Sequence, residues 1–149
     1  MTGVQTCALP ILPVVQISLS PELGAAHHVE LGRALSPLAE DGVLIVGSGH
    51  ATHNLRDWMA NPRRQEPLRY AKAFADWLNE RLDAGDTAAL VDYRARAPEA
   101  VRAHPSEEHY LPILVAWGAA GDAARVERRA AGFEAGVLAN DSYVFHPAP

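Results

Sequence analysis

Residues 42–56 form an apolar run of strand length that breaks into a glycine-rich turn carrying His50 and His53. In α/β folds, ligands and chemistry gather just beyond the carboxyl ends of buried strands. A second polar stretch, residues 104–112, carries His109 behind two glutamates. We therefore expect these two stretches to meet in space around a metal ion.

The N-terminal pattern predicts a parallel βαβ unit and therefore an α/β fold. Residues 12–19 are rich in Val, Ile and Leu, as buried strands are. Residues 20–22, Ser-Pro-Glu, are typical of a helix start, and apolar residues recur at helical spacing up to Ala39. Residues 43–46 then give a second strand, so a right-handed crossover is expected.

The remaining pattern predicts a surface loop, three helices and two closing strands, over residues 58–66, 68–84, 86–97, 106–118, 126–129 and 136–145. Asp86 is the expected N-cap of the second of these helices. The third has acids in its first turn, where the helix dipole favours them, and contains Pro112.

Composition limits the classes of partner. The chain has 149 residues, enough for one domain, and a net charge of −5 from 13 basic and 18 acidic residues. Lys72 is its only lysine, so we expect no nucleic-acid partner. No apolar run approaches the roughly 20 residues that span a bilayer, so we expect no membrane partner. The single cysteine, Cys7, suits a reducing compartment, and a cytoplasmic location is the default expectation.

Residues 1–11, MTGVQTCALPI, lack the basic and apolar regions of a signal peptide. They resemble a translated sequencing-adapter remnant, and an ordinary disordered terminus is the alternative. We treat residues 1–11 as a non-native leader and residues 12–149 as the C-terminal portion of one domain.

The residues in the two polar stretches suit a metal site with open coordination positions. His53 follows a predicted strand and His109 lies in the first turn of a predicted helix, so both would be rigidly held. Glu108 could complete a site of two histidines and one carboxylate, and Asn54 and Arg56 could hold an anionic substrate. The expected substrate-binding residues are therefore Asn54, Arg56 and Glu108. The alternative is that His53 caps a turn and His109 packs at a helix end.

Three other histidines are expected to lie outside the site. His27 and His28 fall in the first predicted helix and are expected at its surface or boundary. His104 precedes a proline and is expected to pack or cap rather than coordinate.

Four segments carry a resemblance to a known family: VVQISL (14–19), GVLIVGSGHATHNLR (42–56), HPSEEHYLPILVAWGAAGD (104–122) and GVLANDSYVFHP (136–147). They resemble the C-terminal half of the DODA-type (LigB-like, class III) extradiol ring-cleaving dioxygenases. The resemblance implies an α/β sandwich around a central mixed sheet flanked by helices, with non-haem Fe(II) or Zn(II) in a cleft. It implies opening of catechol-type rings, such as dihydroxyphenylalanine, with O₂.

By motif position, the resemblance places His53 and His109 at the metal centre. His53 is the expected ligand, and His109 is the expected ligand or the acid/base that handles the catechol proton. His50 occupies a position where family members often have a small residue, and no role is assigned to it.

The family's first half carries G-H-G-S and A-H-W type motifs that supply further metal-site histidines, and neither occurs here. The expectation is a truncated and inactive fragment of an extradiol dioxygenase. The alternative function is a non-catalytic metal-binding or interaction domain. The apolar faces could also pack as a homodimer.

Overall fold

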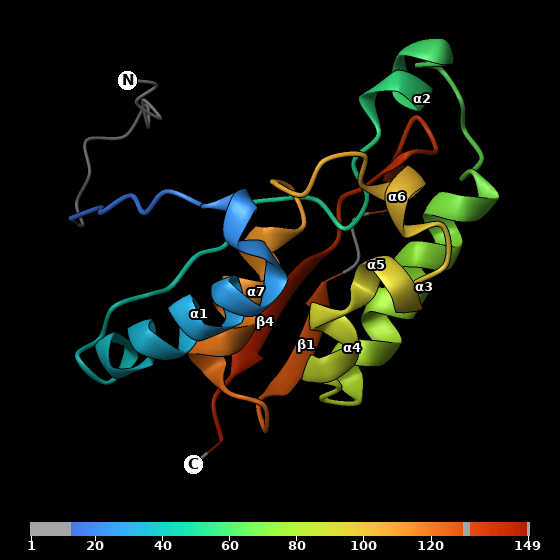
Figure 1. The fold of residues 1–149 in the computed structure, drawn as a ribbon. Helices are drawn as coiled ribbons and strands as arrows, with labels where there is room; N and C mark the ends of the chain where they lie inside the picture. Colours follow the sequence, from blue (N-terminus) through green and yellow to red (C-terminus); the bar gives the residue numbers. More distant parts are fainter. Residues whose placement is uncertain (1–12, 130–131, 149) are drawn as a thin grey trace.

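The computed structural model describes residues 13–129 and 132–148, so the leader at 1–11 with Cys7 lies outside the described residues. The elements in chain order are η1 Pro21–Leu23, α1 Gly24–Glu40, α2 Leu55–Ala60, α3 Arg69–Asp83, α4 Thr87–Val91, α5 Tyr93–Arg96, α6 Ala100–Ala103, α7 Leu111–Ala120, β1 Arg125–Arg129, β2 Phe133–Glu134, β3 Leu138–Ala139 and β4 Ser142–His146. Helices and antiparallel strand pairs together confirm the α/β class (Figure 1). Within the described ranges, no helix has the length and apolar character required to cross a membrane.

Helices α1 and α7 pack with their backbones in close contact (Figure 1). Two glycines allow this approach: a Cβ on Gly32 would overlap the carbonyl oxygen of Val115, and a Cβ on Gly118 would overlap that of Val29. Helix α1, with η1 before it, covers the helix predicted after residue 20, and α7 overlaps the helix predicted at 106–118.

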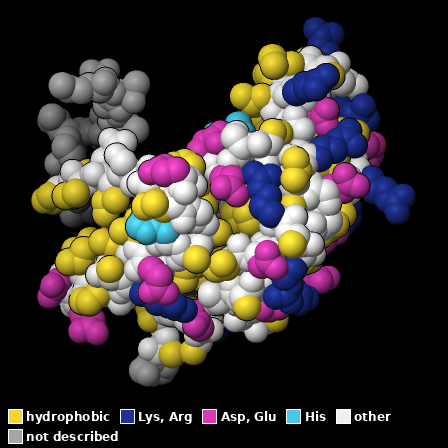
Figure 2. Space-filling view, viewed as in Figure 1, with side chains coloured by type: hydrophobic (Ala, Val, Ile, Leu, Met, Phe, Trp, Pro, Cys, Tyr) yellow, Lys and Arg dark blue, Asp and Glu magenta, His cyan; other side chains and the backbone are white. Residues whose placement is uncertain are grey.

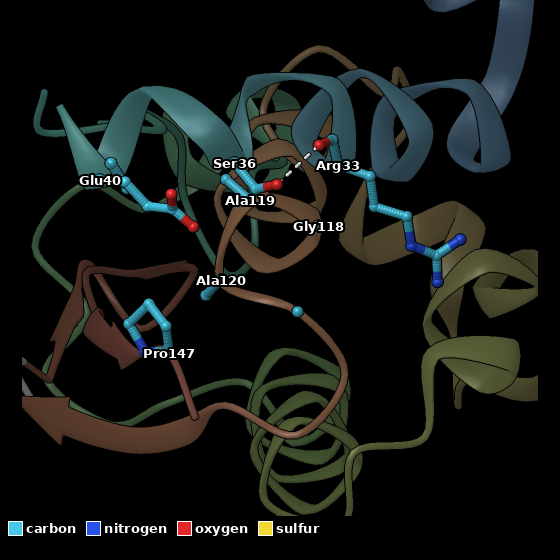
Figure 3. Close-up of a pocket in the computed structure, with 9 residues that line it drawn as sticks. Arg33, Ser36, Glu40, Gly118, Ala119, Ala120 and Pro147 are labelled. Atoms are coloured by element: carbon cyan, nitrogen blue, oxygen red, sulfur yellow. Dashed lines mark hydrogen bonds between the residues drawn. The ribbon is translucent and has the colours of Figure 1, made fainter. Parts of the chain in front are cut away.

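A surface hollow of about 380 Å³ lies along the α1–α7 pair (Figure 3). Its charged lining groups are Arg33 and Glu40, and the Ser36 hydroxyl donates to the carbonyl oxygen of Arg33 at 2.9 Å. None of its lining residues is a predicted site residue. The hollow is therefore separate from the predicted metal centre.

Helix α3 forms the centre of the core, as its amphipathic pattern predicts. Phe74, Leu78 and Leu82 are 0–1% exposed and recur at the spacing of one helix face. Each fully buried side chain of this size contributes on the order of 2 kcal/mol of hydrophobic stabilisation. The next helix, α4, begins as expected, because the Asp86 carboxylate accepts a hydrogen bond from the Ala89 backbone N–H at 2.9 Å.

Strands β1 and β4 form an antiparallel pair five residues long, which confirms the predicted strand at 126–129. The single strand predicted at 136–145 is instead divided into β3 and β4, with residues 140–141 outside both strands. One face of β4 packs on the helices: Phe145 meets Trp117 of α7 edge-to-face at 5.6 Å between ring centroids. On the same face, the Tyr143 hydroxyl donates to Asn79 Oδ1 of α3 at 2.6 Å. Val144, on the opposite face, is 40% exposed. The strand pair therefore links α3 to α7 through one face only.

The predicted parallel strands at 12–19 and 43–46 are wrong for the residues described. Residues 13–19 and 43–46 run as irregular chain with no strand pairing (Figure 1). Val14 and Val15 are 79% and 86% exposed, and Leu44 is 83% exposed. An apolar run shows that a segment can be buried, but a strand also needs a neighbour that accepts its backbone hydrogen bonds.

Hydrophobic side chains consequently lie at the surface on the side of the molecule that carries residues 13–20 and α1 (Figure 2). Lys and Arg side chains instead gather toward the opposite end, around α2 and α3 (Figure 2).

Helix boundaries also differ from prediction. The single helix predicted over 86–97 is divided at Asp92 into α4 and α5. The helix expected from Ser106 begins at Leu111, and residues 105–110 form bends and turns before it. Pro112 therefore lies in the first turn of α7, where a missing N–H costs no hydrogen bond. Helix α2 begins before the predicted loop at 58–66 and extends into it, because Asn54 caps it: its Oδ1 accepts from the Asp57 N–H at 3.0 Å.

His104 is a buried core residue, as expected, and it anchors the histidine-bearing turn. Its Nε2 donates to the carbonyl oxygen of Ala51 at 2.9 Å, and its ring packs against Phe74 and Tyr110. Its Nδ1 is buried without a hydrogen-bond partner in the described residues, so a second ring proton would have no acceptor. Burial, reinforced by the nearby charge of Arg94, lowers the pKa of His104 to about 4.

This buried imidazole makes the stability of the chain pH-dependent. Because the folded pKa lies below the unfolded value of about 6.5, its contribution is present above pH 6.5 and is lost as the pH falls toward 4. We expect the free energy of unfolding to fall by about 2 kcal/mol when the pH is lowered from 7 to 5, because the unfolded chain takes up a proton at His104 and the folded chain does not. Urea titrations at the two pH values measure this.

The matched control is His104→Gln, whose amide can still donate to Ala51 but does not titrate. Its loss of stability between pH 7 and pH 5 should be smaller by that amount. An equal loss in both proteins would show that His104 is not the titrating group.

Candidate metal centre

The turn at residues 50–53 is hydrogen-bonded to two segments that lie far from it along the chain, around His109 and Ala139. The His50 N–H donates to the carbonyl oxygen of His109 at 3.1 Å, and the Ala51 N–H donates to that of Ala139 at 3.1 Å. The buried Thr52 hydroxyl accepts from the Ala139 N–H at 2.9 Å. These bonds place the turn beside the segment before α7 and against the β2–β3 hairpin.

The far end of the turn is fixed equally well. The His53 N–H donates to the carbonyl oxygen of Ala103 at 2.8 Å. Asn54 is 6% exposed and uses both ends of its amide: Nδ2 donates to the Arg102 carbonyl oxygen at 2.7 Å while Oδ1 caps α2. Asn54 therefore positions the backbone after His53, and its amide groups are occupied in this structure.

His50, His53 and His109 converge. One ring nitrogen from each lies within 4.8 Å of the other two. The rings of His53 and His109 stack with centroids 3.5 Å apart and an interplanar angle of 19°. The Nδ1 atoms of His50 and His109 are 3.4 Å apart. All three side chains are half-buried. The expected meeting of the two stretches is present, with a third histidine added.

The environment favours neutral imidazoles. Partial burial, followed by the proximity of His109 and His50, lowers the pKa of His53. Burial and then the proximity of His50 lower the pKa of His109. Both groups therefore carry a free ring-nitrogen lone pair at neutral pH, which is the form that binds a metal or accepts a proton.

The donor set fits a divalent transition metal. Neutral imidazole suits Zn, Fe, Cu and Ni, and three histidines are a recurrent protein ligand set that leaves positions open. Two nitrogens bonded to one zinc at about 2.0 Å in tetrahedral geometry lie about 3.3 Å apart. The 3.4 Å between the Nδ1 atoms of His50 and His109 is close to that separation.

The two glutamates before His109 have different surroundings. Glu107 accepts from the Tyr93 hydroxyl at 2.8 Å and from Arg94 Nε at 3.1 Å, so it stabilises the core. Glu108 is exposed and accepts from the Ser106 hydroxyl at 2.8 Å. Burial opposes its ionisation, but its own backbone N–H, Ser106 and the histidines beside it outweigh that effect and lower its pKa. Glu108 is therefore ionised near the imidazoles.

Arg56 lies on α2 and is exposed, and it makes no side-chain hydrogen bond or ion pair within the described residues.

His27 is exposed on α1, whereas His28 is buried there, with its Nδ1 donating to the carbonyl oxygen of Gly24 at 2.7 Å. Neither belongs to the cluster.

His50 was missed by sequence reasoning. The available signal was its spacing from His53, since His-Ala-Thr-His places two imidazoles three residues apart in one turn. The spacing alone does not show that the turn folds both rings toward His109.

Gly49 permits the close approach of the two stretches. A Cβ at this position would overlap the carbonyl oxygen of His109, the atom that accepts from the His50 N–H. Any larger residue must push the two segments apart.

We therefore expect Gly49→Ala to lower the free energy of unfolding by about 1–3 kcal/mol, the usual effect of overpacking. Chemical denaturation measures the loss, and the imidazole NMR signals of His50 and His109 should shift with it. Ser48→Ala, at an exposed neighbour, is the control and should change neither. Wild-type stability and unchanged imidazole signals in Gly49→Ala would contradict the close approach.

Comparison with known proteins identifies the family of the chain. The family model for the catalytic LigB subunit of aromatic ring-opening dioxygenase matches residues 1–146. A 4,5-DOPA dioxygenase extradiol of Beta vulgaris is 38% identical over 134 residues, which is 90% of this chain and 49% of that protein. A protein of the same name from Portulaca grandiflora is 38% identical over 141 residues, 93% of this chain and 51% of that protein.

A solved structure agrees with the sequence comparison. The crystal structure of an uncharacterized protein from Escherichia coli K12 matches with a TM-score of 0.70 at 29% identity, covering 80% of this chain and 50% of that chain. The chain spans about half the length of the curated relatives it matches. These matches confirm the family resemblance, and the chain belongs to the LigB family of extradiol aromatic ring-opening dioxygenases.

Proposed function

We propose that this chain forms part of an enzyme that opens catechol-type rings with O₂ at a non-haem metal centre containing His53 and His109. The observation that carries the proposal is the 3.5 Å stacking of these two imidazoles, which come from the two family motifs. The names of the curated relatives favour a dihydroxyphenylalanine-like substrate.

His53 and His109 would hold the metal, with His109 as the alternative acid/base. When bound, Fe(II) or Zn(II) supplies a Lewis acid with open positions for the substrate oxygens. Because burial keeps both imidazoles neutral, each can offer a ring-nitrogen lone pair either to the metal or to a catechol hydroxyl proton.

A proton taken by His109 would be stabilised locally. The ionised carboxylate of Glu108 raises the proton affinity of both His53 and His109, which partly offsets the effect of burial. Glu108 would thus stabilise an imidazolium formed when the catechol is deprotonated. A direct contact of Glu108, Asn54 or Arg56 with substrate remains a prediction. Asn54 and Glu108 already make side-chain hydrogen bonds, whereas the Arg56 side chain makes none within the described residues.

The overall reaction balances as a dioxygenation. The ring carbon–carbon bond next to the two hydroxyl-bearing carbons breaks, and both atoms of O₂ enter the product, a muconic semialdehyde. The half-buried site would limit water around the deprotonated catechol, which strengthens its interaction with the neighbouring charges.

The test is oxygen uptake with dihydroxyphenylalanine or catechol by the native protein that carries this sequence, after loading with Fe(II). We expect the ring-opened semialdehyde to form, and its visible absorbance measures the rate of formation. His53→Ala and His109→Ala should each lower kcat/KM by roughly 10²–10⁴-fold, because each removes a ligand or a proton acceptor.

His27→Ala, which changes an exposed histidine on α1, is the matched control and should leave turnover unchanged. Undiminished turnover in His53→Ala would rule out the role assigned to that residue. No oxygen uptake by the loaded wild-type protein with any catechol would count against the proposed function itself.

A homodimer and a cytoplasmic location remain predictions.

A further inference from the structure

We propose that Arg94 is a positioning residue for His109: its guanidinium holds the segment 104–110 at two points and so fixes where that segment presents the imidazole. The inference rests on the proposed function in that His109 acts at the site, as a metal ligand or as the acid/base. It holds for either of those two roles. Arg94 lies on α5, and its side-chain hydrogen bonds go to the segment itself rather than to the imidazole.

The segment that carries His109 has little backbone structure of its own. Residues 105–110 form bends and turns between α6 and α7. Among the residues that the structure describes, none of the backbone N–H groups of residues 106–109 donates to another backbone group. The first such bonds come from Tyr110 and Leu111, whose N–H groups both donate to the Glu107 carbonyl oxygen, at 2.9 and 3.0 Å. The chain before Glu107 therefore depends on side chains from elsewhere to hold it.

Arg94 provides two of the missing contacts. Its Nη1 donates to the His104 carbonyl oxygen at 2.7 Å, and its Nε donates to Glu107 Oε1 at 3.1 Å. These two acceptors lie at the start and in the middle of the segment. Both bonds come from one planar guanidinium with fixed donor directions, so neither acceptor can move without loss of hydrogen-bond geometry. Arg94 and Glu107 are half-buried, which reduces screening of the pair by solvent.

The helix that carries Arg94 is anchored in the core. The buried Tyr93 ring stacks on Tyr110 with centroids 3.9 Å apart, and the Tyr93 hydroxyl donates to the same Glu107 oxygen at 2.8 Å. The Tyr110 hydroxyl donates to the Leu90 carbonyl oxygen at 2.8 Å. His109 thus lies between Glu107 and Tyr110, which are both held by α4 and α5. Its backbone is therefore fixed from either side.

The same contacts separate the two adjacent glutamates. Glu107 is bound to Arg94 and Tyr93, whereas Glu108 stays beside the imidazoles. Without Arg94, the half-buried Glu107 would keep only Tyr93, and the start of the segment could rotate. The expected consequence is a displaced His109 imidazole rather than an unfolded chain, because a partly exposed ion pair contributes little to stability.

The experiment compares Arg94→Met with Arg96→Met in the native protein that carries this sequence. Arg96 is the matched control, because it lies on the same helix and its ion pair is with Asp86, at 3.5 Å. NMR of the metal-free protein measures the contact between the ring protons of His53 and His109, whose centroids are 3.5 Å apart. We expect this contact to be lost in Arg94→Met and kept in Arg96→Met.

Turnover with Fe(II) and dihydroxyphenylalanine is the second measurement. The kcat of Arg94→Met should fall by about 10–100-fold, the usual effect of removing a group that orients a site residue, while KM changes less. Arg96→Met should match the wild type. Arg94→Lys keeps the charge, but one ammonium group cannot reproduce both directions of the guanidinium fork, so it should restore only part of the kcat.

Wild-type ring contacts and wild-type kcat in Arg94→Met would overturn the proposal, as would full activity in Arg94→Lys. Circular dichroism and the denaturation midpoint show whether each variant is folded. If Arg94→Met does not fold, Arg94→Lys decides by the same two measurements: a weakened ring contact with lowered kcat supports the proposal, and wild-type values overturn it.

The result is separable from the proposed function. Loss of the ring contact in Arg94→Met, in a protein whose wild type consumes no oxygen, would leave the positioning of His109 standing and remove the dioxygenase proposal. Equal turnover in the wild type and in Arg94→Met would do the reverse.

Discussion

The backbone hydrogen bonds donated by the turn at residues 50–53 are the constraint on which the site depends. They end on the carbonyl oxygens of His109, Ala139 and Ala103, three points separated along the chain. A turn tied to only one of these could rotate its side chains away from the others. Tied to all three, it holds two imidazoles against a third from the segment before α7.

The charge state of the site follows from where those hydrogen bonds place it. His53 and His109 lie half-buried and beside one another, and both burial and the neighbouring imidazoles lower their pKa values. His104, directly behind the turn, is fully buried and neutral for the same reason. Neutral imidazoles at His53 and His109 offer the lone pairs that a divalent cation or a substrate proton requires.

Elements with local signals were predicted well. The helix after residue 20 and helix α3 have apolar side chains at helical spacing, and a helix satisfies its own hydrogen bonds. The cap at Asp86 and strand β1 were also predicted, and β4 lies mostly within the strand predicted at 136–145. The predicted parallel strands failed, because the hydrogen-bonded neighbour of a strand is not specified by the strand's own residues. His50 was missed because its direction depends on how the turn is held, which no local pattern reports.

The sequence by itself determined the α/β class, the main helices, and the pairing of the His53 and His109 motifs that identifies the family. It determined these because side-chain periodicity, capping residues and motif spacing are properties of contiguous residues. Only the tertiary structure decided that His50 joins the cluster, that Asn54 is committed to backbone partners and that Glu107 turns into the core while Glu108 stays near the imidazoles. Each of these depends on contacts between segments distant along the chain, where packing and backbone hydrogen bonds fix the direction of a side chain.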